Sequence, residues 1–362
     1  MGILRVLLIT VVILIICLIL LPRTNKEKVI QLKLLKFIAS ICILCIISFS
    51  FALYFFKDTL WADTEYKDQI MKKVYLECLP TDNNEQTRKA LKLTNYDLHN
   101  FPIKQLIEVL ENDPNIKTLY LKSMTIENAQ QVSLFLPNNK FLDTIIMANT
   151  NSDVLQKLFE IVPHTKSLKI LVANNNKIDL PALNNLKKAM ENSTLKELEL
   201  DNTKFGDDIA KLQIINDILT TPNTMLTRLS LRSNSINDQD LIALISNITS
   251  NTKILELDLW NNDIKNLGAK SIADLLIKNS SLTELSLGYN DISDAGIIYI
   301  ANALSQNTTL KKLDLSRNPF YDEATRVLAT SLQKNHTLKQ LKLHTEGISK
   351  EQLKKLEYLF TK

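Results

Sequence analysis

The sequence has few of the residues that catalytic and cofactor sites need. Among its 362 residues there are 6 glycines, 4 cysteines and 4 histidines. Loops that bind phosphate groups are rich in glycine, and the sequence contains no such loop. The histidines are scattered, and none is spaced from a cysteine or an acidic residue as in a metal site. We therefore expect no catalytic residue, no metal and no cofactor, and we predict that the protein is not an enzyme.

Cysteine and net charge are also limited. Cys17, Cys42 and Cys45 lie inside apolar runs, which leaves Cys78 alone in the rest of the chain. A single cysteine cannot form an internal disulfide, so we expect a fold that is stable without one. The net charge is only +4, and no block of lysine and arginine indicates a nucleic-acid partner. No small-molecule substrate is evident either.

Two long apolar runs stand near the start of the chain. Val6–Leu21 is apolar except for one threonine, and Phe37–Phe56 is a longer run without a single charge. A helix that spans a membrane needs roughly 20 apolar residues, a length that the second run meets. We predict transmembrane helices at 1–22 and 37–56, joined by a basic loop at 23–36. The alternative for the first run is a cleaved signal peptide, although no small-residue cleavage site follows it.

The loop between the two runs predicts the orientation. It contains one acidic residue, Glu27, and five basic residues: Arg23, Lys26, Lys28, Lys33 and Lys36. Positively charged loops stay on the cytoplasmic side. We therefore expect a two-helix membrane protein whose remaining residues are extracytoplasmic. The alternative is that the lysines only cap the ends of two helices.

Internal repetition dominates the second half of the sequence. The pattern L-x-x-L-x-L-x-x-N begins at 226, 254, 282 and 310, and its apolar part recurs at 338, so these units are equal in length. Less regular units begin at 195, 168, 142 and 116. These nine units each predict one strand, and Leu91 with Leu93 indicates a further strand. Between the strands, apolar residues recur at helical spacing and predict one helix per unit.

Asparagines recur at two places in each unit. We expect the first set to bind loop backbone groups as a structural ladder; it consists of Asn176, Asn234, Asn262, Asn290 and Asn318. We expect the second set to end the helices in a left-handed conformation; it consists of Asn192, Asn223, Asn251, Asn279, Asn307 and Asn335. Glycosylation sequons occur at Asn192, Asn247, Asn279, Asn307 and Asn335, but capping alone explains four of these.

The pattern resembles the ribonuclease-inhibitor-like family of leucine-rich-repeat proteins, most clearly over 226–345. The resemblance implies an α/β solenoid shaped like a horseshoe, with parallel strands on the concave face and helices on the convex face. It assigns repeats to 88–348. We further predict a linker and an N-terminal cap helix within 57–87, with the helix at 63–79, and a C-terminal cap helix at 349–362. In this family the concave face usually binds another protein.

The strand positions between the leucines predict the exposed concave surface. Adjacent strands lie about 4.8 Å apart, so we expect Arg232 to flank Trp260 on one side and Gly288 to leave space on the other. Tryptophan, tyrosine and arginine dominate binding hot spots. The candidate partner-binding residues are Tyr120, Glu199, Arg232, Asp258, Trp260, Tyr289, Asp314 and Arg317. In the alternative interpretation Trp260 only covers its neighbours, and the acidic residues belong to a solvated face of mixed charge.

Three functions fit these observations. The first is a membrane-anchored module that binds a protein partner on its concave face. The second is a regulator of a signalling enzyme such as a GTPase, which would require cytosolic repeats. The third is a structural envelope protein. The lysine, asparagine and isoleucine content suggests an AT-rich genome, such as that of an intracellular bacterium.

Overall fold

The computed structural model describes residues 76–79, 88–94, 114, 116–206, 208–246, 248 and 253–360. The chain divides into two compact units, 1–73 and 74–362. The apolar runs Val6–Leu21 and Phe37–Phe56 and the basic loop lie outside the described residues. Among the helices that the structure describes, none has the length and apolar character needed to cross a membrane.

The unit formed by 74–362 is built on one sheet of eleven strands that follow one another in sequence order. From β2 onward every neighbouring pair is parallel. The nine strands expected from residue 116 are β3–β11, and the further strand at Leu91–Leu93 lies in β2. The strands are β1 Leu76–Leu79, β2 Arg88–Thr94, β3 Ile116–Lys122, β4 Thr144–Ala148, β5 Ile170–Val172, β6 Glu197–Glu199, β7 Arg228–Ser230, β8 Glu256–Asp258, β9 Glu284–Ser286, β10 Lys312–Asp314 and β11 Gln340–Lys342.

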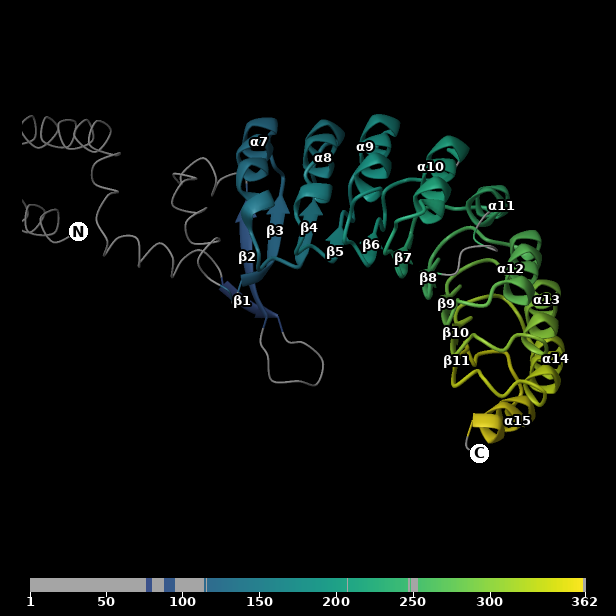
Figure 1. The fold of residues 1–362 in the computed structure, drawn as a ribbon. Coiled ribbons are helices and arrows are strands. Elements are labelled where there is room, and N and C mark those ends of the chain that lie inside the picture. Colours follow the sequence, from purple (N-terminus) through teal and green to yellow (C-terminus); the bar gives the residue numbers. More distant parts are fainter. Residues whose placement is uncertain are drawn as a thin grey trace, which may run out of the picture. The chain divides into compact units, whose positions relative to one another are not determined.

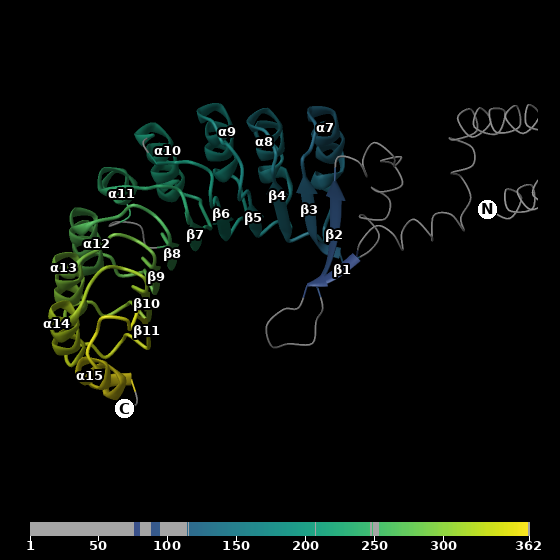
Figure 2. The ribbon, with the colours of Figure 1, turned by 180° about the vertical axis from the view of Figure 1, so that it is seen from behind.

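A helix follows each strand from β3 to β11 and lies on the outer side of the sheet (Figures 1 and 2). The α-helices are α7 Ile126–Phe135, α8 Ser152–Phe159, α9 Leu180–Met190, α10 Ile209–Thr220, α11 Asp238–Ile245, α12 Asn266–Lys278, α13 Asp294–Leu304, α14 Asp322–Leu332 and α15 Lys350–Phe360, and short 3-10 helices follow α7 and α8 at Leu136–Asn138 and Val162–His164. Leucines of the strands and apolar residues of the helices form a continuous buried core between the two layers. The α/β architecture expected from the repeats is confirmed.

The two ends of the sheet differ. At the N-terminal end β1 pairs antiparallel with β2, so the prediction of a cap helix reaching Leu79 is wrong: Leu76–Leu79 is a strand. A strand satisfies the backbone groups at the open edge of β2, which a helix cannot do. At the C-terminal end α15 packs as expected, with Leu356 buried and Leu353 and Leu359 half-buried.

The asparagines of the turn bind backbone groups in two repeats at once. Asn262 is buried, and its Oδ1 accepts hydrogen bonds from Asn234 N and Ile236 N, each at 3.0 Å. Its Nδ2 donates to Leu231 O and Leu259 O, also at 3.0 Å. Asn176, Asn234, Asn290 and Asn318 occupy equivalent places. Each of these five side chains links its own repeat to the one before it.

The second set of asparagines does not adopt the expected conformation. None of those that the structure describes has a positive φ, and Asn279 leaves α12 in an extended conformation with φ −83° and ψ 131°. Its side chain acts instead: Oδ1 accepts from Leu282 N at 2.8 Å, and Nδ2 donates to Ile248 O of the preceding repeat at 3.0 Å. Asn307 and Asn335 repeat this arrangement. The expectation of left-handed caps is therefore wrong.

The asparagines of the glycosylation sequons differ in burial. Asn279, Asn307 and Asn335 are buried and hydrogen-bonded, so their amides are inaccessible in the folded chain. Asn192 is exposed, and Asn247 lies outside the described residues. The structural role of the three buried asparagines accounts for them without glycosylation.

A third set of polar side chains caps the helices across repeats. α14 has no cap from its own N-cap residue, Tyr321. Asp294 of the preceding repeat instead accepts hydrogen bonds from Tyr321 N at 2.8 Å and Ala324 N at 3.3 Å. Asn266 caps α13 in the same way, and Asp322 accepts from Ser349 N before α15. A carboxylate at a helix start is favourable on electrostatic grounds, and here it serves the next helix.

Candidate functional site

Four of the predicted binding residues come together on the concave face. Arg232 and Trp260 follow β7 and β8, while Tyr289 and Arg317 occupy the turns after β9 and β10. Tyr120 lies on β3, with three strands between it and β7, so it does not belong to this group. Glu199, Asp258 and Asp314 lie on β6, β8 and β10 beside the group.

The four side chains form a row of alternating contacts, which we call the aromatic–arginine row. The Arg232 guanidinium carbon lies 4.8 Å from the centre of the Trp260 ring. The Trp260 and Tyr289 rings are 5.2 Å apart and tilted by 32°. Arg317 completes the row 5.8 Å from the centre of the Tyr289 ring. Each contact joins neighbouring repeats, so each ring has a partner on both sides, and cation–π attraction holds both arginines in place.

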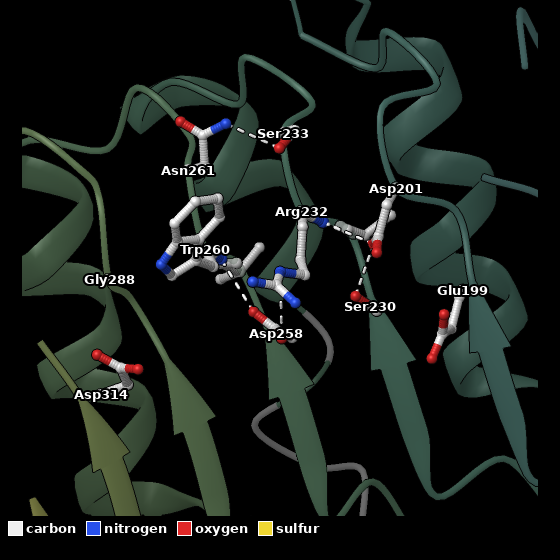
Figure 3. Close-up of polar contacts among 12 residues, drawn as sticks. Glu199, Asp201, Ser230, Arg232, Ser233, Asp258, Trp260, Asn261, Gly288 and Asp314 are labelled. Carbon is white, nitrogen blue, oxygen red and sulfur yellow. Dashed lines mark hydrogen bonds and ion pairs between the residues drawn. The ribbon is translucent and has the colours of Figure 1, made fainter. Parts of the chain in front are cut away.

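Gly288 provides the room for Trp260, which points from the end of β8 toward the next strand (Figure 3). A Cβ atom at Gly288 would lie 2.7 Å from Trp260 Cδ1 and 3.0 Å from Asp314 Oδ1. The expected space beside Trp260 is thus present, and the indole ring itself fills it. The Trp260 backbone N–H donates to Asp258 Oδ1 at 3.0 Å, which fixes the start of this turn.

Tyr289 and Arg317 have a backbone conformation that bulky residues rarely adopt. Their φ angles are +54° and +56°. The same position in six other repeats has a similar φ, but there it is occupied by Ser123, Asn149, Asn175, Asn202, Ser233 and Asn261. Asparagine tolerates this left-handed conformation, whereas a larger side chain costs about 1–2 kcal/mol. The fold alone would therefore be served better by asparagine at 289 and 317.

A network of ion pairs lies beside the row, and the sequence reasoning missed its central residue. Arg228 forms a close ion pair with Glu199 and further ones with Glu197 at 3.5 Å and Glu256 at 3.3 Å. The parallel register places Glu197, Arg228 and Glu256 side by side. The sequence signal was available, because Arg228 and Glu256 occupy the same position in successive units of the repeat pattern.

Most charges of the concave face have partners within the chain. Arg232 pairs with Asp258 at 3.7 Å, Lys312 with Glu284 at 2.6 Å, and Lys342 with Asp314 at 3.8 Å. The structure thus agrees with a face of mixed charge. These partly exposed pairs contribute little to stability individually, but they fix the positions of side chains around the row.

Two carboxyl groups on the β6–β8 side, Asp201 and Glu256, have a raised pKa, chiefly because they are partly buried. Burial raises the pKa of Asp201, and nearby Glu199 and Asp258 add to the effect. Hydrogen bonds from Ser230 Oγ at 2.6 Å and Arg232 N at 2.9 Å oppose it. Burial also raises the pKa of Glu256, with a further contribution from Glu284. This side of the face carries more negative charge than its own arginines neutralise.

The row borders a groove of about 550 Å³ that extends over β7–β11. Trp260, Arg232 and Asp258 line one end of the groove, and Lys312 and Lys342 line the other. Among the described residues no cluster of three or more histidine, cysteine, aspartate or glutamate side chains could hold a metal ion. Geometrically, the surface offers rigid aromatic edges and fixed charges to an extended ligand.

Comparisons with known proteins agree with the repeat pattern. A family model described as Leucine Rich repeat matches residues 191–212, 223–244, 250–273, 278–301 and 306–329. A search of curated proteins finds no match. One similar solved structure is the actin-binding site 2 of leiomodin-1, at 24% identity over 41% of this chain and 86% of that chain, with a TM-score of 0.39.

Two further solved structures are similar. An internalin from Listeria monocytogenes is 22% identical over 70% of this chain and 68% of its own, with a TM-score of 0.41. The yeast Rad7 and Elc1 complex contains a chain that is 17% identical over 93% of this chain and 91% of its own, with a TM-score of 0.42. The five matched segments show leucine-rich repeats between residues 191 and 329, in agreement with the parallel sheet and its outer helices.

Proposed function

We propose that this chain is a membrane-anchored leucine-rich-repeat protein of the ribonuclease-inhibitor-like type, and that it binds a protein partner through its concave face without catalysis. The observation that carries the proposal is the aromatic–arginine row of Arg232, Trp260, Tyr289 and Arg317. Residues of these types supply most of the energy in protein interfaces. Tyr289, 47% exposed, is available to a partner.

The mutual stacking of the row supports binding. Ordering a flexible side chain at an interface costs about 0.5–1.5 kcal/mol. The four side chains of the row are already held by their neighbours, so less ordering is needed when a partner binds. The groove beside the row adds fixed carboxylates and ammonium groups that define one orientation for the partner.

Support for the membrane anchor comes from the sequence. The runs Val6–Leu21 and Phe37–Phe56 have the length and composition of spanning helices. The five basic residues between them favour a cytoplasmic loop, and this supports the proposal that the repeats lie on the other side of the membrane. The equal spacing of the regular units and the helix in each of them support the ribonuclease-inhibitor-like type.

The binding proposal is tested by crosslinking the full chain in its native cells and measuring the affinity of the captured partner. Trp260→Ala is expected to lower the affinity for that partner by about 30-fold or more, the effect of losing about 2 kcal/mol at a hot spot. Tyr299→Ala is the matched control, because Tyr299 is an exposed aromatic residue on the outer helix α13. Equal binding of wild type and Trp260→Ala would contradict the proposal.

The anchoring proposal has a separate test. We expect the full chain to remain in membranes after alkaline carbonate extraction, and protease added outside spheroplasts to digest the repeats. Repeats that stay intact until the membrane is opened would place them in the cytosol. That result would contradict the proposed orientation and favour a cytosolic regulator of a signalling enzyme such as a GTPase.

A further inference from the structure

The concave face has an uneven distribution of charge. The charges compared are those of the three residues of each strand and of the three residues that follow it. On β6–β8 there are five carboxylates, Glu197, Glu199, Asp201, Glu256 and Asp258, against Arg228 and Arg232, a net charge of −3. On β9–β11 there are two carboxylates, Glu284 and Asp314, against Lys312, Arg317 and Lys342, a net charge of +1 with His344 counted as neutral.

Arg317 differs from the other cations of this face. Arg228, Arg232, Lys312 and Lys342 each have a carboxylate of the chain within ion-pair distance. The contact that Arg317 makes is with the Tyr289 ring, and no carboxylate in the described part of the chain forms an ion pair with it. Its side chain is exposed. Arg317 therefore presents a positioned guanidinium group that has no anionic partner among the described residues.

The position of Arg317 also has a conformational cost that the fold does not require. Six other repeats have serine or asparagine at this left-handed position, and asparagine would adopt it with less strain. The neighbouring Tyr289 has the same unfavourable φ and holds the Arg317 guanidinium group by its ring. Two adjacent strained residues thus build one exposed cation on an aromatic support.

We propose that the partner is an extended protein segment that places a carboxylate on Arg317, at the Tyr289 end of the aromatic–arginine row. This inference rests on the proposed function and names the chemistry of its contact. A guanidinium group binds a carboxylate by two parallel hydrogen bonds. The negative β6–β8 side repels a carboxylate and the β9–β11 side attracts it, so the acidic part of the segment lies toward β11.

The test selects a phage-displayed library of random twelve-residue peptides on the full chain in nanodiscs. Selections are repeated on Trp260→Ala, on Arg317→Asn and on Arg326→Gln. The last is a matched control that also removes one positive charge, but from the exposed face of α14. We expect wild type and Arg326→Gln to enrich the same aspartate- and glutamate-containing peptides.

Arg317→Asn is expected to bind those peptides about tenfold more weakly, the effect of losing one charge-assisted hydrogen-bonded contact. The same variant should unfold at a higher urea concentration than wild type, because asparagine relieves the strain at 317. A gain in stability combined with a loss of affinity cannot result from a damaged fold. Raising the salt concentration from 50 to 500 mM should weaken peptide binding by wild type more than peptide binding by Arg317→Asn.

The outcomes separate this inference from the proposed function. Peptides that depend on Trp260 but lack carboxylates, or that bind Arg317→Asn as tightly as wild type, would overturn the role of Arg317 and leave concave-face binding intact. If no peptide is enriched, or if enriched peptides ignore both Trp260→Ala and Arg317→Asn, the proposed function and this inference are both overturned.

Discussion

Removing the side chain of Asn262 should destabilise the solenoid more than any exposed substitution in the same repeats. Asn262 is 7% exposed and forms four hydrogen bonds of 3.0 Å to backbone groups of two repeats. A net contribution of about 1 kcal/mol for each bond gives a loss of about 4 kcal/mol for Asn262→Ala. A water molecule that replaced the amide would reduce this to about 2 kcal/mol.

The assay is urea unfolding of the full chain in nanodiscs, followed by far-ultraviolet circular dichroism. With a slope of about 3 kcal/mol per molar urea, a loss of about 4 kcal/mol lowers the midpoint by about 1.3 M. Because repeats are coupled mainly to their neighbours, amide hydrogen exchange is measured as well. The amides of Asn234 and Ile236 should lose protection first, since they donate to Asn262.

Asn302→Ala is the matched control, because Asn302 is exposed on α13 and undergoes the same chemical change. Its midpoint should stay within about 0.3 M of wild type, since exposed substitutions usually change stability by less than about 0.5 kcal/mol. If Asn262→Ala unfolds at the same urea concentration as Asn302→Ala, the asparagine ladder does not stabilise the fold as argued.

Three further predictions concern the same repeats. Gly288→Ala should displace the Trp260 ring, because the new Cβ at 288 would lie 2.7 Å from Trp260 Cδ1. We expect a changed near-ultraviolet circular dichroism signal and a loss of about 1 kcal/mol in the free energy of unfolding measured with urea. An unchanged signal would contradict the close packing. Asp294→Ala should cost about 1 kcal/mol by uncapping α14, whereas Asp291→Ala, which breaks only an exposed pair with Lys265, should cost less than about 0.5 kcal/mol. Burial raises the pKa of Asp201, so ionisation of its carboxyl group opposes folding. The contribution of Asp201 to the free energy of unfolding is therefore favourable in acid and is lost as the pH rises from its unfolded pKa of 3.8 through its folded pKa. Asp201→Asn should gain stability over wild type as the pH rises, and identical urea midpoints for the two proteins at pH 4 and pH 7 would refute this.

The strands could be predicted because each repeat places the same residue at the same point of the sheet. Leu229, Leu257 and Leu285 hold the same place in successive units and lie side by side in the parallel register. A leucine at each of these points is buried, so apolar spacing alone locates the strand. The same reasoning placed Arg232 against Trp260, because adjacent strands bring equivalent side chains together.

The parts that escaped prediction depend on partners distant in sequence. β1 lacks a repeat signal, and its pairing with β2 follows from the need to cover a sheet edge. The buried asparagines were expected to end helices through their own backbone, but Asn279 and Asn307 act on a neighbouring repeat through their side chains. Asp294 was recognised as favourable at a helix start, yet the helix that it caps is the next one.

Stability does not account for Tyr289 and Arg317, and this separates them from the asparagine ladder. The asparagine ladder uses one residue type to satisfy the same backbone groups in the regular repeats, as Asn262 and Asn290 do. Six other repeats have serine or asparagine at the position of 289 and 317, and asparagine adopts the left-handed conformation at lower cost. Tyr289 and Arg317 incur strain there and place a ring and a cation at the surface. Residues that weaken the fold while building a rigid exposed contact are better explained by what they bind than by what they support.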